Sequence, residues 1–200
     1  MQFFKYGKTE IEYLKKKDRK LACVIDRIGI IERKVTPDLF TALISSIVGQ
    51  QISRKAAATV WNRLCELLGE EITPEAIAGV SDECIKECGM SHRKASYIRG
   101  CADAVLNGSL DISELESLPD AEVIKKLTTL HGVGIWTAEM LMMFSMQRQD
   151  IVSWDDLALK RGICRLYNHK NLTKEQFMRY KKRYSPYGSV ASLYLWEISR

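Results

Sequence analysis

Two adjacent carboxylates, Asp155 and Asp156, stand directly before an apolar helical pattern and are the side chains in this sequence best placed for chemistry. An aspartate at the start of a helix stays ionised, because the helix dipole favours its anion. Such a carboxylate stabilises positive charge that develops in a transition state, and it can position or deprotonate an attacking water. Capping the helix is the plainer role open to both residues, and it is common for aspartate.

A glycine pair, Gly132-x-Gly134, precedes these acids by about one helix and one loop. Glycine tolerates positive φ and has no Cβ, so a tight turn here can bring backbone N–H groups close to a phosphate. The helix that the pattern predicts from Ile135 adds an N-terminus that favours an anion. A tight connection between two packed helices would use the same spacing. The turn is therefore a candidate anchor for a nucleic-acid backbone, held without reading base sequence.

The elements that must position these residues are predicted to be helices almost throughout. Strand-like alternation is nearly absent, and a turn or kink is expected at residues 49–53. Apolar periodicity and capping residues predict helices over residues 9–17 with Thr9 as cap, 18–31, 36–48, 55–68, 73–78, 81–86, 94–106, 111–116, 120–130, and from 155 or 156 to 167.

Composition limits the class of protein. A chain of 200 residues with 46% hydrophobic content can bury a sizeable core, as one large domain or two small lobes. No apolar run approaches a membrane span, and the first residues lack a signal peptide's architecture, so we expect a soluble, intracellular protein. Six cysteines include no Cys-x-x-Cys pair, and Cys84 and Cys88 have no partner pair at zinc spacing, which predicts free thiols.

The positive charge is unevenly distributed. The net charge is +5, and the segment from Lys160 to Tyr184 contains nine basic residues and a single acid, Glu175. Such a segment fits attraction to phosphates or a solvated helix face. We interpret the basic residues near the N-terminus, Lys15–Lys17 with Arg19 and Lys20, as solvated.

Residues 127–138, Leu-x-x-Leu-x-Gly-Val-Gly-x-x-Thr-Ala, with the aspartate at 156, resemble the helix-hairpin-helix Gly/Pro-Asp DNA glycosylase superfamily. Residues 134–138 and 154–161 look most like its alkylpurine branch, the 3-methyladenine DNA glycosylase II type. The resemblance extends over about residues 38–198, including segments 47–53, 89–95 and 184–196.

The resemblance implies an all-α fold of two helical lobes with a DNA-binding cleft between them. The helix-hairpin-helix would lie at about residues 124–146. One lobe would be residues 37–145, ending in this motif, and the other would be residues 1–36 plus 146–200, carrying the catalytic aspartate. The N-terminal segment is too short for the β-rich domain of many alkylpurine enzymes, and residues 151–154 lack the proline that relatives often have there.

The implied reaction is hydrolysis of an N-glycosidic bond through an oxocarbenium-like transition state. Aligned on the family motif, Asp156 takes the catalytic position, and Asp155 would be a cap or supporting residue. Bifunctional members carry a Schiff-base lysine just after the hairpin. Trp136 stands there, so the resemblance implies a monofunctional enzyme that leaves an abasic site, with Lys160 a phosphate contact or simply exposed.

A base pocket is implied at Trp136, Met140, Leu157 and Trp196. An indole face attracts a flat cation such as 3-methyladenine, although both tryptophans also suit core packing.

Further residues are implied as DNA contacts, because the target base must leave the helix stack. The hairpin would contribute Gly132, Val133, Gly134 and Thr137. In the turn 91–94, His92 matches a wedge position with Arg93 beside it, and Gln50 and Gln51 are candidates for contacting the opposite strand or the flipped base.

One cofactor is implied, a sodium or potassium ion on the backbone carbonyls of Thr128, Leu130 and Val133. No iron–sulfur cluster is expected, because Cys164 alone lies in the C-terminal region where some relatives carry four cysteine ligands.

The expected partner is double-stranded DNA with damaged bases, bound by a monomer without membrane association, in the cytoplasm or nucleoid of a bacterium or archaeon or the nucleus of a eukaryote. Two alternatives stay open. One is a glycosylase for uracil, mismatched thymine or an oxidised purine, and the other is a non-catalytic helix-hairpin-helix DNA-binding module.

Overall fold

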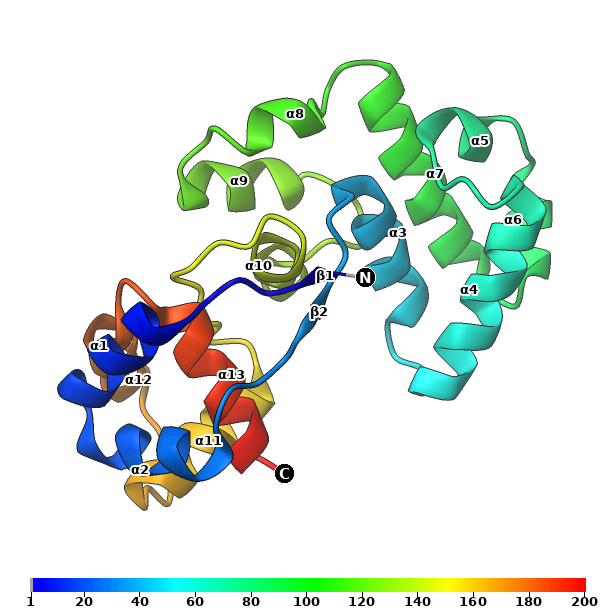
Figure 1. Cartoon of the computed structure of the whole chain (residues 1–200). Helices are drawn as coiled ribbons and strands as arrows, with labels where there is room; N and C mark the ends of the chain where they lie inside the picture. Colours follow the sequence, from blue (N-terminus) through cyan, green and yellow to red (C-terminus); the bar gives the residue numbers. More distant parts are fainter. Residues whose placement is uncertain (1) are drawn as a thin grey trace. The chain divides into compact units, whose positions relative to one another are not determined.

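The computed structural model describes residues 2–200, which form thirteen helices and two very short strands (Figure 1). The chain divides into two compact units. The central unit is Thr36–Leu141, and the terminal unit contains the residues up to Val35 together with Met142–Arg200. The sequence placed the boundaries after residues 36 and 145. The second boundary instead falls inside a continuous helix, Ile135–Phe144, whose two ends belong to different units.

The central unit is a cluster of helices around α7, which packs against α3, α5 and α6. Its core contains fully buried side chains such as Ile44, Ile77 and Ile98. Capping side chains fix most helix starts, because each accepts a hydrogen bond from a backbone amide of the first turn. The helices are α3 (Leu39–Gly49), α4 (Arg54–Leu68), α5 (Pro74–Ala78), α6 (Asp82–Glu87), α7 (His92–Leu106), α8 (Ile112–Leu115), α9 (Asp120–Leu127) and the first part of α10 (Ile135–Phe144).

The terminal unit joins the two ends of the chain. Its helices from the N-terminal segment lie beside those from the C-terminal segment, and α13 packs against both α11 and α2 (Figure 1). The α11–α13 crossing is close, since a Cβ added at Gly162 would lie 2.2 Å from the carbonyl oxygen of Leu195. The elements are β1 (Gln2–Phe3), α1 (Lys8–Lys17), α2 (Arg19–Ile28), β2 (Lys34–Val35), α11 (Leu157–Tyr167), α12 (Lys174–Tyr184) and α13 (Gly188–Ile198), with β1 and β2 antiparallel.

The predicted helical class is confirmed, but several predicted ends were wrong. Helix α1 is capped at Gly7, whose amide donates to Glu10 Oε2 at 2.7 Å, and Thr9 is already inside the helix. Helix α2 stops at Gly29 (φ 75°), a left-handed conformation that glycine adopts without strain. Helix α9 ends three residues earlier than the pattern predicted, because the hairpin turn begins at Thr128. Every helix within residues 2–200 is too short or too polar to span a bilayer.

Candidate functional site

Asp156 is the N-cap of α11, and it is buried, with 7% of its surface exposed. Its backbone is extended (φ −85°, ψ 108°), and its Oδ1 accepts a hydrogen bond of 2.8 Å from the amide of Leu159. Asp155 is exposed and is not the cap of this helix. Of the two roles expected for Asp155, cap or supporting residue, the cap was therefore wrong. One residue, Asp156, holds both the cap and the predicted catalytic position.

Helix α13 of the same unit holds the chain segment that leads into Asp156. The amide of Ile151 donates to Ser189 Oγ at 2.9 Å, and Ser192 Oγ donates to the carbonyl of Ile151 at 3.0 Å. Residues 151–153 are all buried. Serines of α13 thus fix, through side-chain hydrogen bonds, the segment in which relatives often have a proline.

Lys160 lies one turn into α11, with its Nζ 4.6 Å from the centre of the Trp154 ring. That ring makes an edge-on contact with Phe177, with 5.1 Å between ring centres. A cation–π contact of this kind fixes the position of the lysine head group. Lys160 is therefore half-buried, with its head group held over an indole ring.

The hairpin turn of the central unit depends on one of its two glycines. Gly132 has φ +86°, and a Cβ added there would lie 2.3 Å from Tyr97 Cδ2. Gly134 has no atom within 4 Å of such a Cβ, and its carbonyl accepts from the amide of Ala138 at 3.0 Å to open α10. Only Gly132 is required by conformation and space, because the Tyr97 ring packs directly on its Cα.

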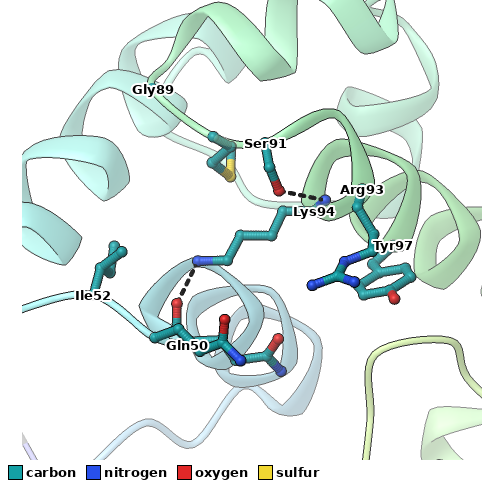
Figure 2. Close-up of a pocket in the computed structure, with 9 residues that line it drawn as sticks. Gln50, Ile52, Gly89, Ser91, Arg93, Lys94 and Tyr97 are labelled. Carbon is teal, nitrogen blue, oxygen red and sulfur yellow. Dashed lines mark hydrogen bonds between the residues drawn. The ribbon is translucent and has the colours of Figure 1, made fainter.

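Gln50 and Lys94 hold this turn from neighbouring elements. Gln50 Nε2 donates to the carbonyl of Gly132 at 2.8 Å. Lys94 Nζ donates to the carbonyls of Val48 at 2.8 Å and Gln50 at 2.7 Å, at the C-terminal end of α3 (Figure 2). Burial lowers the pKa of Lys94. The α3–α4 turn, the start of α7 and the hairpin are thus connected by hydrogen bonds within one unit.

A pocket of about 240 Å³ lies beside Lys94, between the α3–α4 turn and the start of α7 (Figure 2). Gln51 on its rim is exposed and has a left-handed backbone (φ 58°), so the turn presents this side chain at a conformational cost. Gln50, by contrast, supports the hairpin with its side chain. The two glutamines, predicted together, therefore have different surroundings.

The other predicted DNA contacts differ in accessibility. His92 and Arg93 are exposed in the first turn of α7, after the cap Ser91, where the sequence predicted a turn between helices. Val133 and Thr137 are buried, so contacts from them would come from backbone atoms. Sequence reasoning missed Tyr97 and Lys94, because a lone tyrosine and a lone lysine on a helix carry no signal of the carbonyls or Cα that they contact.

The four predicted pocket residues come two from each unit. Trp136 is 44% exposed at the start of α10, and Met140 is half-buried in the same helix. In the terminal unit Leu157 is 70% exposed, and the half-buried Trp196 packs on Phe144 with 5.6 Å between ring centres. Core packing thus accounts for Trp196 in part, but not for the exposed side chains of Trp136 and Leu157.

Acidic, histidine and cysteine side chains do not gather into a metal site within residues 2–200. Among the described residues, no three His, Cys, Asp or Glu side chains come together as a metal ion would need. The six cysteines are free thiols, and burial raises the pKa of Cys101 to about 12. A thiol with this pKa stays protonated at neutral pH and is a poor nucleophile or ligand.

Comparison with known proteins places these features in a family. The model for "HhH-GPD superfamily base excision DNA repair protein" matches residues 44–186. The chain is 33% identical over 165 residues to DNA-3-methyladenine glycosylase 1 of Schizosaccharomyces pombe, covering 80% of this chain and 72% of that protein. It spans 58% of YfjP, a putative DNA-3-methyladenine glycosylase of Bacillus subtilis, and 57% of DNA-3-methyladenine glycosylase 2 of Escherichia coli.

Two solved structures are similar over nearly the whole chain. DNA-3-methyladenine glycosidase of Bacillus halodurans has a TM-score of 0.89 at 39% identity, covering 100% of this chain and 93% of that one. Mag1 of S. pombe, a 3-methyladenine DNA glycosylase in complex with abasic DNA, has a TM-score of 0.83 at 28% identity, covering 95% and 96%. The chain therefore belongs to the HhH-GPD superfamily of base excision DNA repair proteins.

Proposed function

We propose that this chain is a monofunctional DNA glycosylase that hydrolyses the N-glycosidic bond of an alkylated purine of the 3-methyladenine type. The observation that carries the proposal is Asp156, a buried carboxylate anchored at the start of α11. The relatives named above are 3-methyladenine glycosylases or glycosidases, and Mag1 was solved with abasic DNA, the product expected of this reaction.

The chemistry assigned to Asp156 is electrostatic. As the bond from C1′ to the purine breaks, its electron pair leaves with the base and positive charge develops on the sugar. A carboxylate whose orientation is already fixed stabilises that charge without reorganising. The oxygen of a water then bonds to C1′, and the proton that the water loses passes to the carboxylate. Anchoring of Oδ1 by the Leu159 amide supplies the fixed orientation.

The proposal excludes strand cleavage by this chain. A lyase step needs an amine that forms a Schiff base with the sugar. Trp136 stands at the position after the hairpin where bifunctional relatives have that amine, and Lys160 holds its ammonium group over the Trp154 ring. The product is thus an abasic site in an intact strand.

Substrate recognition is assigned to two exposed and two half-buried apolar side chains. The indole of Trp136 suits a flat cationic purine, with Met140, Leu157 and Trp196 as further pocket residues. Phosphate contact is assigned to the backbone amides of Gly132, Gly134 and Thr137, because the Val133 amide already donates to the Leu130 carbonyl. His92, Arg93 and Gln51 are placed near the extruded base. The protein would act on double-stranded DNA as a monomer.

A monovalent cation fits the hairpin. The carbonyl oxygens of Thr128, Leu130 and Val133 are neutral, hard donors of the kind that sodium and potassium take. The Leu130 carbonyl also accepts from the Val133 amide at 3.1 Å, which is compatible because a carbonyl has two lone pairs. A bound cation would supply positive charge to a DNA phosphate.

The test is base release from methylated duplex DNA, with the free purines resolved and the strand analysed with and without alkali. Release of 3-methyladenine or 7-methylguanine, with nicking only after alkali, supports the proposal. Release only from uracil, mismatched-thymine or oxidised-purine duplexes would replace the substrate. No release from any of them would leave a DNA-binding module.

A further inference from the structure

Two basic segments that are far apart in the sequence meet in the terminal unit. Lys17, Arg19 and Lys20 stand where α1 passes into α2, and Arg183 is in the last turn of α12. They line an open hollow of about 400 Å³ together with Asp18, Tyr167 and Tyr180. The N-terminal lysines, interpreted from the sequence as solvated, thus share one surface with the basic segment of the C-terminal region. We call these seven residues the basic surface.

The single carboxylate of this surface is already compensated. Asp18 is buried, and its Oδ1 accepts from the amide of Leu21 at 2.9 Å. Its Oδ2 accepts from Tyr167 Oη at 2.5 Å and from Arg183 Nη1 at 2.6 Å. Because these fixed donors already bind both oxygens of the carboxylate, Asp18 does not neutralise the remaining cations of the hollow.

The remaining cations, Lys17, Arg19 and Lys20, have no acidic partner in the part of the chain that the structure describes. Within residues 2–200, none of Lys17, Arg19 and Lys20 forms an ion pair. Asp26, also on α2, is paired with Lys15 at 2.7 Å. An unneutralised group of this kind attracts an anion from solution.

Aromatic rings lie against three of the four cationic groups of the basic surface, those of Lys17, Lys20 and Arg183. Tyr167 and Tyr180 stack with 4.1 Å between ring centres. Lys20 Nζ lies 5.6 Å from the centre of the Tyr167 ring, and the Arg183 guanidinium lies 5.2 Å from that of Tyr180. Ordering these side chains in advance lowers the entropy that an incoming anion would have to offset.

We propose that the basic surface binds phosphates of duplex DNA, as a contact additional to the site at Asp156. Tyr167 is the last residue of α11 and Asp156 caps its start, so the two sites are separated by the length of the helix, about 16 Å. The proposal rests on the proposed function only for the identity of the partner as DNA. It adds affinity that does not depend on lesion or base sequence.

The lining favours a phosphate backbone over an acidic protein. The hollow contains charged, basic and tyrosine side chains and no aliphatic one. Protein interfaces generally have an apolar centre, which this surface lacks, whereas non-specific DNA binding needs only positive charge.

The test is a double charge reversal, Lys17→Glu with Lys20→Glu, in the whole chain. Binding to an undamaged duplex several helical turns long is measured as a function of salt. We expect the Kd to rise about tenfold or more, and the slope of log Kd against log salt to fall by about 2. A matched control, Lys8→Glu with Lys86→Glu, changes two exposed lysines outside the hollow and gives the same net charge. It should leave the slope nearly unchanged.

A second measurement locates the contact directly. The amines of Lys17 and Lys20 in the wild-type chain are acetylated with and without the duplex, and the products are identified by mass spectrometry. Protection by DNA supports the proposal. Equal acetylation with and without DNA, or a charge-reversed variant that binds like its control, overturns it. Base release by the wild-type chain is scored separately, so loss of the proposed activity and loss of this surface are distinguishable.

Discussion

The start of α11 and the hairpin turn fix their candidate functional groups in opposite ways. At the start of α11 the functional group is a side chain, because Asp156 caps the helix and presents its carboxylate. At the hairpin the conformation depends on the absence of a side chain, because Gly132 adopts a positive φ and leaves room for the ring of Tyr97. The cap bond of Asp156 is a contact within one turn of helix, whereas the hairpin turn depends on contacts with Gln50 after α3 and Tyr97 of α7.

This difference predicts that substitutions in the two regions will have different effects, one on the rate of base release and the other on the fold. A change at Asp156 that keeps the cap should remove chemistry and spare the fold. A change at Gly132 should disturb the fold of the turn, and with it DNA binding, before it affects the reacting groups.

The largest effect is expected from Asp156→Asn. Asparagine is as good an N-cap as aspartate, so α11 and the stability of the protein should persist. Base release should fall by about 10²- to 10⁴-fold, because the negative charge opposite the developing oxocarbenium ion is lost. Single-turnover base release measures the rate, and binding to duplex DNA should stay within about threefold of wild type.

Asp155→Asn is the matched control, since Asp155 is the exposed neighbour with the same chemistry. It should release base at nearly the wild-type rate. Equal losses in the two variants would mean that local negative charge matters, and that Asp156 has no special role. Full activity of Asp156→Asn would remove the residue from the mechanism.

Gly132→Ala should act on stability and DNA affinity. The new Cβ meets the Tyr97 ring at 2.3 Å, and the residue must keep φ +86°. Overpacking combined with the left-handed backbone should cost about 2–4 kcal/mol. Urea unfolding measures this cost, and DNA affinity should fall in the same variant.

Gly134→Ala tests whether the cost belongs to glycines of the turn in general. Its Cβ has open space, and its φ is not positive, so we expect a change within about 0.5 kcal/mol. If both alanine variants cost the same, the contrast between Gly132 and Gly134 is wrong.

The sequence predicted the parts of the site that local rules determine. Helical class and the turn at residues 49–53 follow from periodicity and glycines, whereas the catalytic role of Asp156 stays a prediction from the family motif. The roles of Gln50 and Lys94 could not be predicted, because each depends on an acceptor from another element, the carbonyls of Gly132 and Val48. The same limit holds in the terminal unit, because Asp18 and its partner Arg183 are separated in sequence by most of the chain.

Lys94→Met tests whether the hairpin depends on α7 as well as on its own glycine. Methionine keeps much of the apolar stem and removes the donor, so the carbonyls of Val48 and Gln50 lose a hydrogen bond inside the fold. We expect a loss of about 1–3 kcal/mol in unfolding free energy. DNA affinity should weaken more than the rate of base release at saturating DNA, because the lysine positions the turn and touches no reacting atom.

Exposed Lys55 on α4 provides the control, as Lys55→Met changes the same residue type in the same unit. Its unfolding free energy should stay close to that of the wild type. Arginine at position 94 should restore part of the stability, because it can still donate to a carbonyl. A Lys94→Met variant as stable as the wild type would show that the α3–α4 turn keeps its conformation without hydrogen bonds from Lys94.

Asp18 gives the smallest expected effect and sharpens the comparison, because it is a second N-cap aspartate in the unit that contains Asp156. Burial raises the pKa of Asp18, but hydrogen bonds from Tyr167, the Leu21 amide and Arg183 outweigh it, so the pKa lies below its usual 3.8. A carboxyl with a lowered pKa in the fold stabilises it above the pKa of the unfolded chain, and this contribution disappears as the pH falls through the folded value.

Asp18→Asn should therefore cost about 1 kcal/mol near neutral pH, because asparagine keeps the cap but not the charge opposite Arg183. The difference from wild type should shrink as the pH falls below about 4, where the carboxyl of the unfolded wild-type chain becomes protonated, and vanish once the pH is below the lowered pKa of the folded chain. Urea unfolding of both chains across this range measures it, and base release at neutral pH should be nearly unchanged. A stability difference independent of pH would attribute the effect to packing, whereas a loss of base release would mean that the two capping aspartates are not functionally distinct.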